Sequence, residues 1–306
     1  MDGRSDRTIW LVPKHRSVID LTPMEQEKRV HRLFAFVLSS YSLWTLIFLL
    51  WATATVLLPQ VSVPVWSAFA LFVVTGLLGL GSLVWLCYQG GKIWSGLGGL
   101  FLGLFFAMLW YASLRWAGPF SPSLRVAGLT GGAITLGAVV SRLIRHANLL
   151  PVVAVVVATV DIWNVLMGGL IAQLQVKAPQ VISSVSTPLP APKLPEGVPL
   201  GLPLIGLGDL FFLSFFFAGL WRMGLNPSVS LWTALIAVLM NTILVSGPWG
   251  LRAIPGLPLI CLALLLPHWK AFRYTKEEKK ALIVGGVFLI GLLIFFAWAV
   301  RVLLTP

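Results

Sequence analysis

This chain contains many long apolar runs, and several are longer than the roughly 18 residues that an α-helix needs to cross a lipid bilayer. Hydrophobic residues make up 58% of the 306 residues, whereas charged residues make up only 10%. A soluble domain of this length needs about a quarter charged residues to cover its surface, so most of the outer surface must face lipid. Alternating strands of ~10 residues, typical of outer-membrane barrels, do not occur in the sequence. The sequence therefore predicts an all-α fold, a polytopic transmembrane helical bundle.

Nine membrane segments are predicted, and the eighth of them is short and rich in proline. The segments are residues 33–58, 64–88, 94–114, 125–144, 149–173, 199–221, 228–247, 254–268 and 281–303. The predicted organisation is a cytoplasmic tail (1–32), N-terminal transmembrane helices (33–148), a transmembrane core (149–268) with a proline-rich linker (174–198), and a basic loop with a C-terminal transmembrane helix (269–306).

The lysines and arginines predict the orientation of the chain in the membrane. If the N-terminus is cytoplasmic, 16 of the 22 basic residues fall in cytoplasmic regions and six fall outside. Cytoplasmic loops of membrane proteins are enriched in Lys and Arg, so we expect the N-terminus inside and the C-terminus outside. The net charge of +12 then reflects topology. Binding of nucleic acid is not expected, because the basic residues are scattered and form no patch.

Acidic residues are almost absent from the apolar part of the chain. Only Asp161, Glu196 and Asp209 lie between Lys28 and Lys276, and Glu196 falls in the linker. A carboxylate inside the bilayer costs a few kcal/mol, so Asp161 and Asp209 are candidates for function. Their segments are consecutive and antiparallel, and each aspartate lies about 12 residues from the linker, which places both at similar depth. We expect the two carboxyl groups to face each other.

Two facing carboxyl groups in a low-dielectric site hold one proton between them, because both cannot ionise cheaply. This arrangement suits the hydrolysis of a peptide bond. The ionised group takes a proton from water, and the protonated group donates a hydrogen bond to the developing oxyanion. The sequence predicts no metal and no cofactor, since its four histidines form no zinc-binding pattern and no phosphate-binding loop occurs. Activation of a serine by a histidine within the membrane is not expected either.

The residues around Asp209 resemble a known motif. Gly206-Leu207-Gly208-Asp209 is similar to the Gly-x-Gly-Asp motif of the presenilin and signal peptide peptidase family of intramembrane aspartyl proteases. Glycines at these positions let another backbone approach the aspartate closely. A segment around Asp161 resembles the family's first catalytic helix, although the usual preceding tyrosine is replaced by Val160.

A third motif follows in the same order as in that family. Pro255-Gly256-Leu257 resembles its Pro-Ala-Leu motif, with Gly256 in place of alanine. The resemblance covers about residues 150–267, and it implies that these three residues line the active site and bind substrate. It also implies substrates that are transmembrane helices or remnants of signal peptides. The family usually places the aspartates on its sixth and seventh helices and the proline motif on its ninth, whereas here they fall on the fifth, sixth and eighth.

A helical substrate must unwind before water can reach its peptide carbonyls, and unwound backbone in a membrane needs new hydrogen-bond partners. Residues 180–186, at the start of the linker, are β-prone. We expect them, with the segment around Pro255, to offer an edge to an extended peptide. A plain flexible loop is the other interpretation of residues 180–186.

Several alternatives to the protease remain open from the sequence. The two aspartates suit a proton- or cation-coupled transporter or channel as well. A catalytically silent protein that binds membrane helices would keep the same fold. A prepilin-type peptidase also carries a Gly-x-Gly-Asp motif, but a large cytoplasmic domain is absent and the proline motif fits the presenilin group better. Membrane lipids are expected partners in every case.

Overall fold

A computed structural model describes residues 64–94, 97–116, 118, 121–166, 186–188, 204–246 and 254–304. They all belong to one compact unit, Leu46–Pro306. The predicted tail (1–32), the first membrane segment (33–58), most of the linker (174–198) and the end of the fifth segment lie outside the described residues.

The described part of the chain is helical, as the sequence predicts. Its α-helices are α2 (Val65–Ile93), α3 (Leu97–Arg115), α4 (Ser121–Val140), α5 (Leu149–Leu166), α8 (Leu207–Arg222), α9 (Ser228–Ser246), α10 (Gly256–Leu265) and α11 (Lys276–Leu304). Two 3-10 helices, η2 (Ser141–Leu143) and η3 (Leu266–Ala271), extend α4 and α10. Two short strands, β1 (Ser186–Pro188) and β2 (Leu204–Gly206), pair antiparallel, with Ser186 opposite Gly206. These helices overlap the second to ninth predicted segments, and within the short eighth segment (254–268) the α-helix covers ten residues before a 3-10 helix follows.

Within the described residues, two helices are long and apolar enough to cross a membrane, namely Gly98–Arg115 and Leu124–Leu143. The other apolar helices identified by that criterion are shorter. The structure therefore confirms the helical fold, whereas the number of membrane spans stays a prediction.

The sixth segment departs from its prediction at its N-terminal end. The helix begins at Leu207 and not at residue 199, because residues 204–206 form β2. Gly206 is extended (φ −70°, ψ 144°) and marks the boundary between the strand and the helix. An apolar run alone does not distinguish a buried strand from a helix, and Pro203, Gly206 and Gly208 all disfavour helix. Asp209 consequently lies in the first turn of α8 and not near the middle of its helix.

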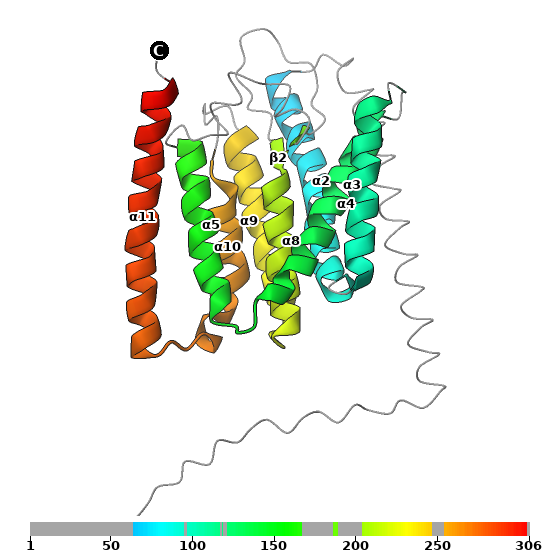
Figure 1. Cartoon of the computed structure of the whole chain (residues 1–306). Helices are drawn as coiled ribbons and strands as arrows, with labels where there is room; N and C mark the ends of the chain where they lie inside the picture. Colours follow the sequence, from blue (N-terminus) through cyan, green and yellow to red (C-terminus); the bar gives the residue numbers. More distant parts are fainter. Residues whose placement is uncertain are drawn as a thin grey trace, which may run out of the picture. The chain divides into compact units, whose positions relative to one another are not determined.

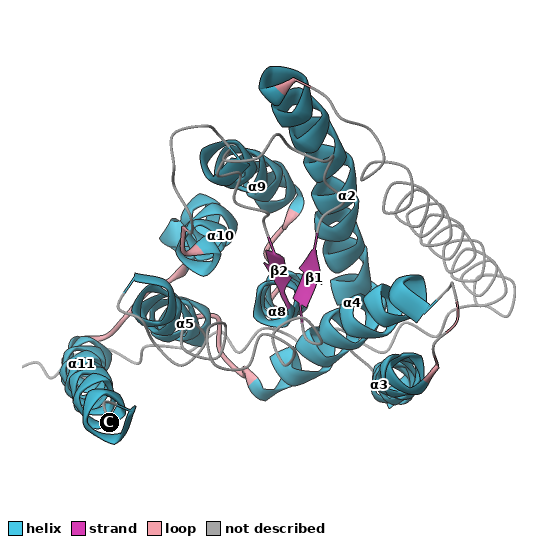
Figure 2. Ribbon diagram, turned by 90° about the horizontal axis from the view of Figure 1, so that it is seen from above, coloured by secondary structure: helices cyan, strands magenta, loops and turns pink. Residues whose placement is uncertain are grey.

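Helix α8 is the central element of the bundle. It packs against α4, α2 and α10, while α3 packs on α4, α9 on α2 and α10, and α5 on α10. Figure 2 shows α8 surrounded by these helices, with β1 and β2 above its N-terminal end. Nine of its residues are buried, and Phe216 and Phe217 are completely inaccessible. A helix that is apolar on all sides belongs in a core, so α8 is well suited to hold a fixed side chain at its start.

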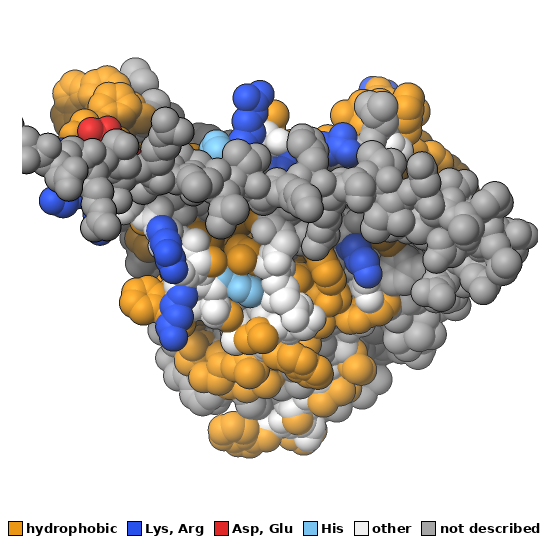
Figure 3. Space-filling view, turned by 90° about the horizontal axis from the view of Figure 1, so that it is seen from below, with side chains coloured by type: hydrophobic (Ala, Val, Ile, Leu, Met, Phe, Trp, Pro, Cys, Tyr) orange, Lys and Arg blue, Asp and Glu red, His pale blue; other side chains and the backbone are white. Residues whose placement is uncertain are grey.

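Consecutive helices alternate in direction, so the connections after α2, α4, α8 and α10 all lie at the lower end in Figure 1. Lysine and arginine side chains gather at this end, which Figure 3 shows from below. They include Lys92, whose ammonium group lies 5.1 Å from the centre of the Trp221 ring. The bundle thus carries on one end the loops that the sequence assigns to the cytoplasm.

A set of hydrogen bonds fixes α5 to the loop before α11 at the same end. The Asn148 amide donates to Arg273 O (2.6 Å) and accepts from Arg273 N (3.1 Å). The Tyr274 hydroxyl donates to Asn148 O at 2.8 Å. Burial and the neighbouring Glu278 raise the pKa of Tyr274, so this hydroxyl keeps its proton. Thr275 and Glu278 then form a capping box, which starts α11 at Lys276 and not at residue 281.

Candidate active site

Asp161 lies on α5 and binds the start of α10. Its Oδ2 atom accepts a hydrogen bond from the backbone N–H of Leu257 at 3.0 Å, and the backbone of Gly256 interacts with the same carboxyl group. Pro255 is the N-cap residue of α10, so Gly256 and Leu257 are its first two helical residues. Their N–H groups have no partner inside the helix, which leaves them available to a carboxyl group of another helix.

Asp209 is the third residue of α8 and folds back on the start of its own helix. Its carboxyl group accepts a hydrogen bond from the backbone of Gly206, the N-cap residue. This is the acidic half of a capping box, and a helix N-terminus favours a negative charge nearby. The sequence around Gly206 therefore positions Asp209 through local backbone geometry.

The two aspartates converge at Gly256. A Cβ atom built on Gly256 would lie 3.8 Å from Asp209 Oδ1 and 4.0 Å from Asp209 Oδ2, while the Gly256 backbone binds Asp161. The Asp161 carboxyl group acts electrostatically on Asp209, and both act on the thiol of Cys261, one turn along α10. Asp161, Asp209 and the segment Pro255-Gly256-Leu257 are thus brought together in space.

The glycines of the Gly-x-Gly-Asp segment have different surroundings. A Cβ atom on Gly206 would lie 3.4 Å from Asp209 Oδ2, and Gly206 pairs with Ser186 of β1. Here another backbone does approach, as the sequence predicts. At Gly208 an added Cβ would meet no described atom within 4 Å, and Gly208 and Leu207 are both exposed. The described residues therefore leave open space at Gly208, the residue before Asp209.

Sequence reasoning missed a third polar group at this place. Asn241 lies on α9, and its Nδ2 atom is 3.9 Å from the Cβ position of Gly256. Its Oδ1 atom is buried without a hydrogen-bond partner among the described residues, as are Asn164 Oδ1 and Trp163 Nε1 near Asp161. Asn241 is the one amide or charged side chain in α9, and that isolation in an apolar helix is the signal that could have found it.

The sequence also missed a serine–histidine pair at the other end of α9. Ser230 Oγ lies 2.9 Å from His268 Nε2 and donates its proton to Leu264 O at 2.7 Å. The serine has one proton, and the carbonyl oxygen can only accept, so the histidine must donate to the serine. This is the reverse of the proton transfer that activates a nucleophile. Ser230 is completely buried, and we interpret the pair as structural.

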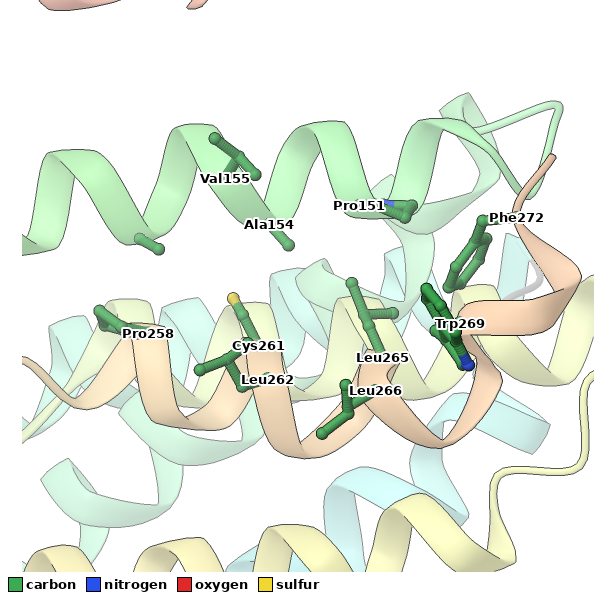
Figure 4. Close-up of a pocket in the computed structure, with 11 residues that line it drawn as sticks. Pro151, Ala154, Val155, Pro258, Cys261, Leu262, Leu265, Leu266, Trp269 and Phe272 are labelled. Carbon is green, nitrogen blue, oxygen red and sulfur yellow. The ribbon is translucent and has the colours of Figure 1, made fainter. Parts of the chain in front are cut away.

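An apolar cavity of about 380 Å³ lies between α5 and α10 (Figure 4). Pro151, Ala154 and Val155 line it on one side, and Pro258, Cys261 and Leu262 on the other. In Figure 4 the Cys261 side chain points toward α5. The cavity offers almost no polar group, so it suits hydrocarbon and carries no chemistry of its own.

No protein-family model, curated protein or solved structure matches this chain. The described residues contain no group of three or more His, Cys, Asp or Glu side chains that could hold a metal ion.

Proposed function

We propose that this protein is an intramembrane aspartyl protease in which Asp161 and Asp209 form the catalytic dyad. One observation carries the proposal: carboxyl groups from two different helices meet at the start of a third, where Leu257 N–H binds Asp161 and Gly256 borders Asp209. Acidic residues are nearly absent from the apolar part of the chain, so a meeting of two of them needs a functional reason.

The proposed setting is a bilayer crossed by the nine predicted segments. Support comes from the outer helices, which present large apolar side chains to their surroundings. On α11 and α3, Phe288 is 71% exposed and Met108 is 70% exposed. Contiguous apolar surface of this kind is rare on soluble monomers and ordinary in lipid. The lower end in Figure 1, with its lysines and arginines, is then cytoplasmic, and the C-terminus lies outside.

In the proposed reaction the dyad holds one proton. The ionised carboxyl group removes a proton from water while the water oxygen bonds to the carbonyl carbon of the scissile peptide. The other carboxyl group gives its proton to the carbonyl oxygen. When the C–N bond breaks, the first carboxyl group passes its proton to the leaving amine, and a hydroxyl group of the tetrahedral intermediate returns a proton to the other carboxylate, so the dyad again holds one proton. The backbone N–H of Leu257 keeps the Asp161 carboxyl group oriented during these steps.

The substrate in this proposal is a transmembrane helix or a signal-peptide remnant that unwinds beside the dyad. Strand β2 leads directly into α8 and already pairs with β1. The backbone is therefore extended up to Gly206, two residues before Gly208 and three before Asp209. Ser186 belongs to the β-prone segment of the linker, while residues 180–185 lie outside the described part. An extended substrate adding to this pair would reach Asp209 across the open space at Gly208.

The decisive experiment is cleavage of a single-span peptide in proteoliposomes by the wild type, Asp161→Asn and Asp209→Asn. We expect each substitution to abolish cleavage, because one carboxyl group alone cannot both activate water and protonate the leaving group. Glu196→Gln is the matched control, since it removes the remaining acidic residue between Lys28 and Lys276 and should leave cleavage intact. A transition-state analogue of aspartyl proteases should inhibit the wild type.

Full activity in either asparagine variant would exclude the dyad. If the wild type cleaves no peptide but carries a proton or cation current that both variants lose, the transporter hypothesis replaces the protease.

A further inference from the structure

The side chain of Asn241, on α9, has no role in the reaction proposed for the two aspartates. Asn241 Nδ2 lies 3.9 Å from the Cβ position of Gly256, and Asp209 Oδ1 lies 3.8 Å from the same point. The amide and the carboxyl group therefore border one small region from two different helices. Asn241 is partly buried, in the last two turns of a helix that is otherwise apolar at this end apart from Thr242 and Ser246.

Leaving the oxygen of this amide without a hydrogen bond lowers the stability of the protein in the absence of substrate. Asn241 Oδ1 is buried, and none of the described groups donates a hydrogen bond to it. A buried acceptor without a partner loses its hydration and gains nothing in return, so leucine, whose side chain has the same branched arrangement of four heavy atoms, would be the more stable residue here. An amide oxygen without a described partner, on a side chain that borders the same region as the Asp209 carboxyl group, indicates that its partner arrives from outside the chain.

Elsewhere in this protein, an asparagine amide binds both backbone groups of a residue that lies outside a helix. Asn148 Nδ2 donates to Arg273 O and Arg273 N donates to Asn148 Oδ1, at 2.6 and 3.1 Å, so one amide satisfies both backbone groups of one residue. An unwound substrate residue in a membrane presents the same pair of groups, with no water to satisfy them.

We infer that Asn241 binds the backbone of the substrate beside the scissile bond, through this two-point pairing. Its Oδ1 atom accepts the substrate N–H and its Nδ2 atom donates to the substrate C=O, once the side chains that cover the oxygen move aside. The inference rests on the proposed function and adds a residue to it. It assigns to the site a preference for extended peptide, since a helical residue has both groups occupied by its own helix.

The test compares Asn241→Leu with Met240→Leu, a neighbouring substitution on an exposed position of α9. Three quantities are measured: the melting temperature of the resting protein, kcat/KM for a single-span peptide, and the affinity of an uncleaved single-span peptide for each variant in the Asp209→Asn background. For Asn241→Leu we expect an equal or higher melting temperature. We also expect kcat/KM and the affinity to fall about ten- to hundredfold, because substrate backbone groups lose their partner.

Met240→Leu should change none of the three quantities. An unchanged affinity and kcat/KM in Asn241→Leu would overturn the inference. A fall in melting temperature that accompanies the loss of activity would also overturn it, since the amide would then be structural. If the wild type cleaves nothing, the protease proposal fails, whereas the binding measurement in the Asp209→Asn background still decides the role of Asn241.

Discussion

The contact between α4 and α8 gives a sharp prediction about how the dyad is positioned. A Cβ atom added at Gly137 of α4 would overlap the carbonyl oxygen of Phe211 and lie 3.1 Å from Phe211 C and Phe215 N. These are backbone atoms of α8, which cannot move aside as a side chain can. Gly137→Ala must therefore push the two helices apart by about 1 Å to restore ordinary van der Waals distances.

Phe211 follows Asp209 by half a helical turn, so the displacement reaches the carboxyl group almost unchanged. A misplacement of about 1 Å in a catalytic group lowers the rate about a hundredfold. Overpacking of the core costs a further 1–3 kcal/mol or so of stability. We expect Gly137→Ala to reduce kcat for a single-span peptide about a hundredfold, measured well below the melting temperature of the variant.

Two substitutions on α4 provide the controls. At Gly132 an added Cβ would lie 3.9 Å from Phe106 Cβ, an ordinary contact, so Gly132→Ala should match the wild type. At Gly128 an added Cβ would lie 2.5 Å from Trp110 N on α3, so Gly128→Ala should lose stability without displacing α8. Equal kcat values for Gly137→Ala and Gly128→Ala would refute the reasoning, because the effect would then come from lost stability alone.

Two further predictions concern the start of α10. Gly256→Ala should keep most activity, since its Cβ would meet Asp209 Oδ1 at 3.8 Å, whereas Gly256→Leu should abolish peptide cleavage by filling the space between α8 and α9. Leu257→Pro removes the N–H group that binds Asp161 Oδ2, and Leu257→Ala removes only the side chain. A hydrogen bond to a charged group contributes about 1.5–3 kcal/mol, so the proline variant should cleave about ten- to hundredfold more slowly than the alanine variant, and equal rates would show that this N–H is dispensable.

The helices of this protein follow from its sequence because one signal, the apolar run, sets their bounds. The prediction fails where a second signal competes with it. Residues 204–206 are as apolar as the helix that follows, yet glycine at 206 and 208 and proline at 203 weaken helix formation, and the pairing of β2 with β1 decides the outcome. That pairing joins residues 16 to 20 positions apart, and no local sequence pattern predicts it.

The residues of the candidate site also differ in whether the sequence alone reveals them. Asp161 and Asp209 stand out in the sequence because a charge within a predicted membrane segment would be expensive, and Gly256 and Leu257 stand out by their motif. Asn241 carries no charge and belongs to no motif, so its role depends on its position in space. Only the packing of α9 on α10 places its amide beside Gly256. The hydrogen bond between Ser230 and His268 could not be predicted from the sequence for the same reason.

The partners of the two carboxyl groups explain how such a site differs from a structural ion pair. The described groups that meet them are backbone N–H groups at the starts of two helices, from Gly206 at α8 and from Gly256 and Leu257 at α10. A lysine or arginine there would bring a whole positive charge and hold both carboxyl groups ionised, which removes the shared proton. Helix starts bring only about half a charge each, concentrated on N–H groups of fixed direction. They can stabilise one negative charge without requiring a second, so in the proposed reaction the remaining proton is available for transfer to the substrate.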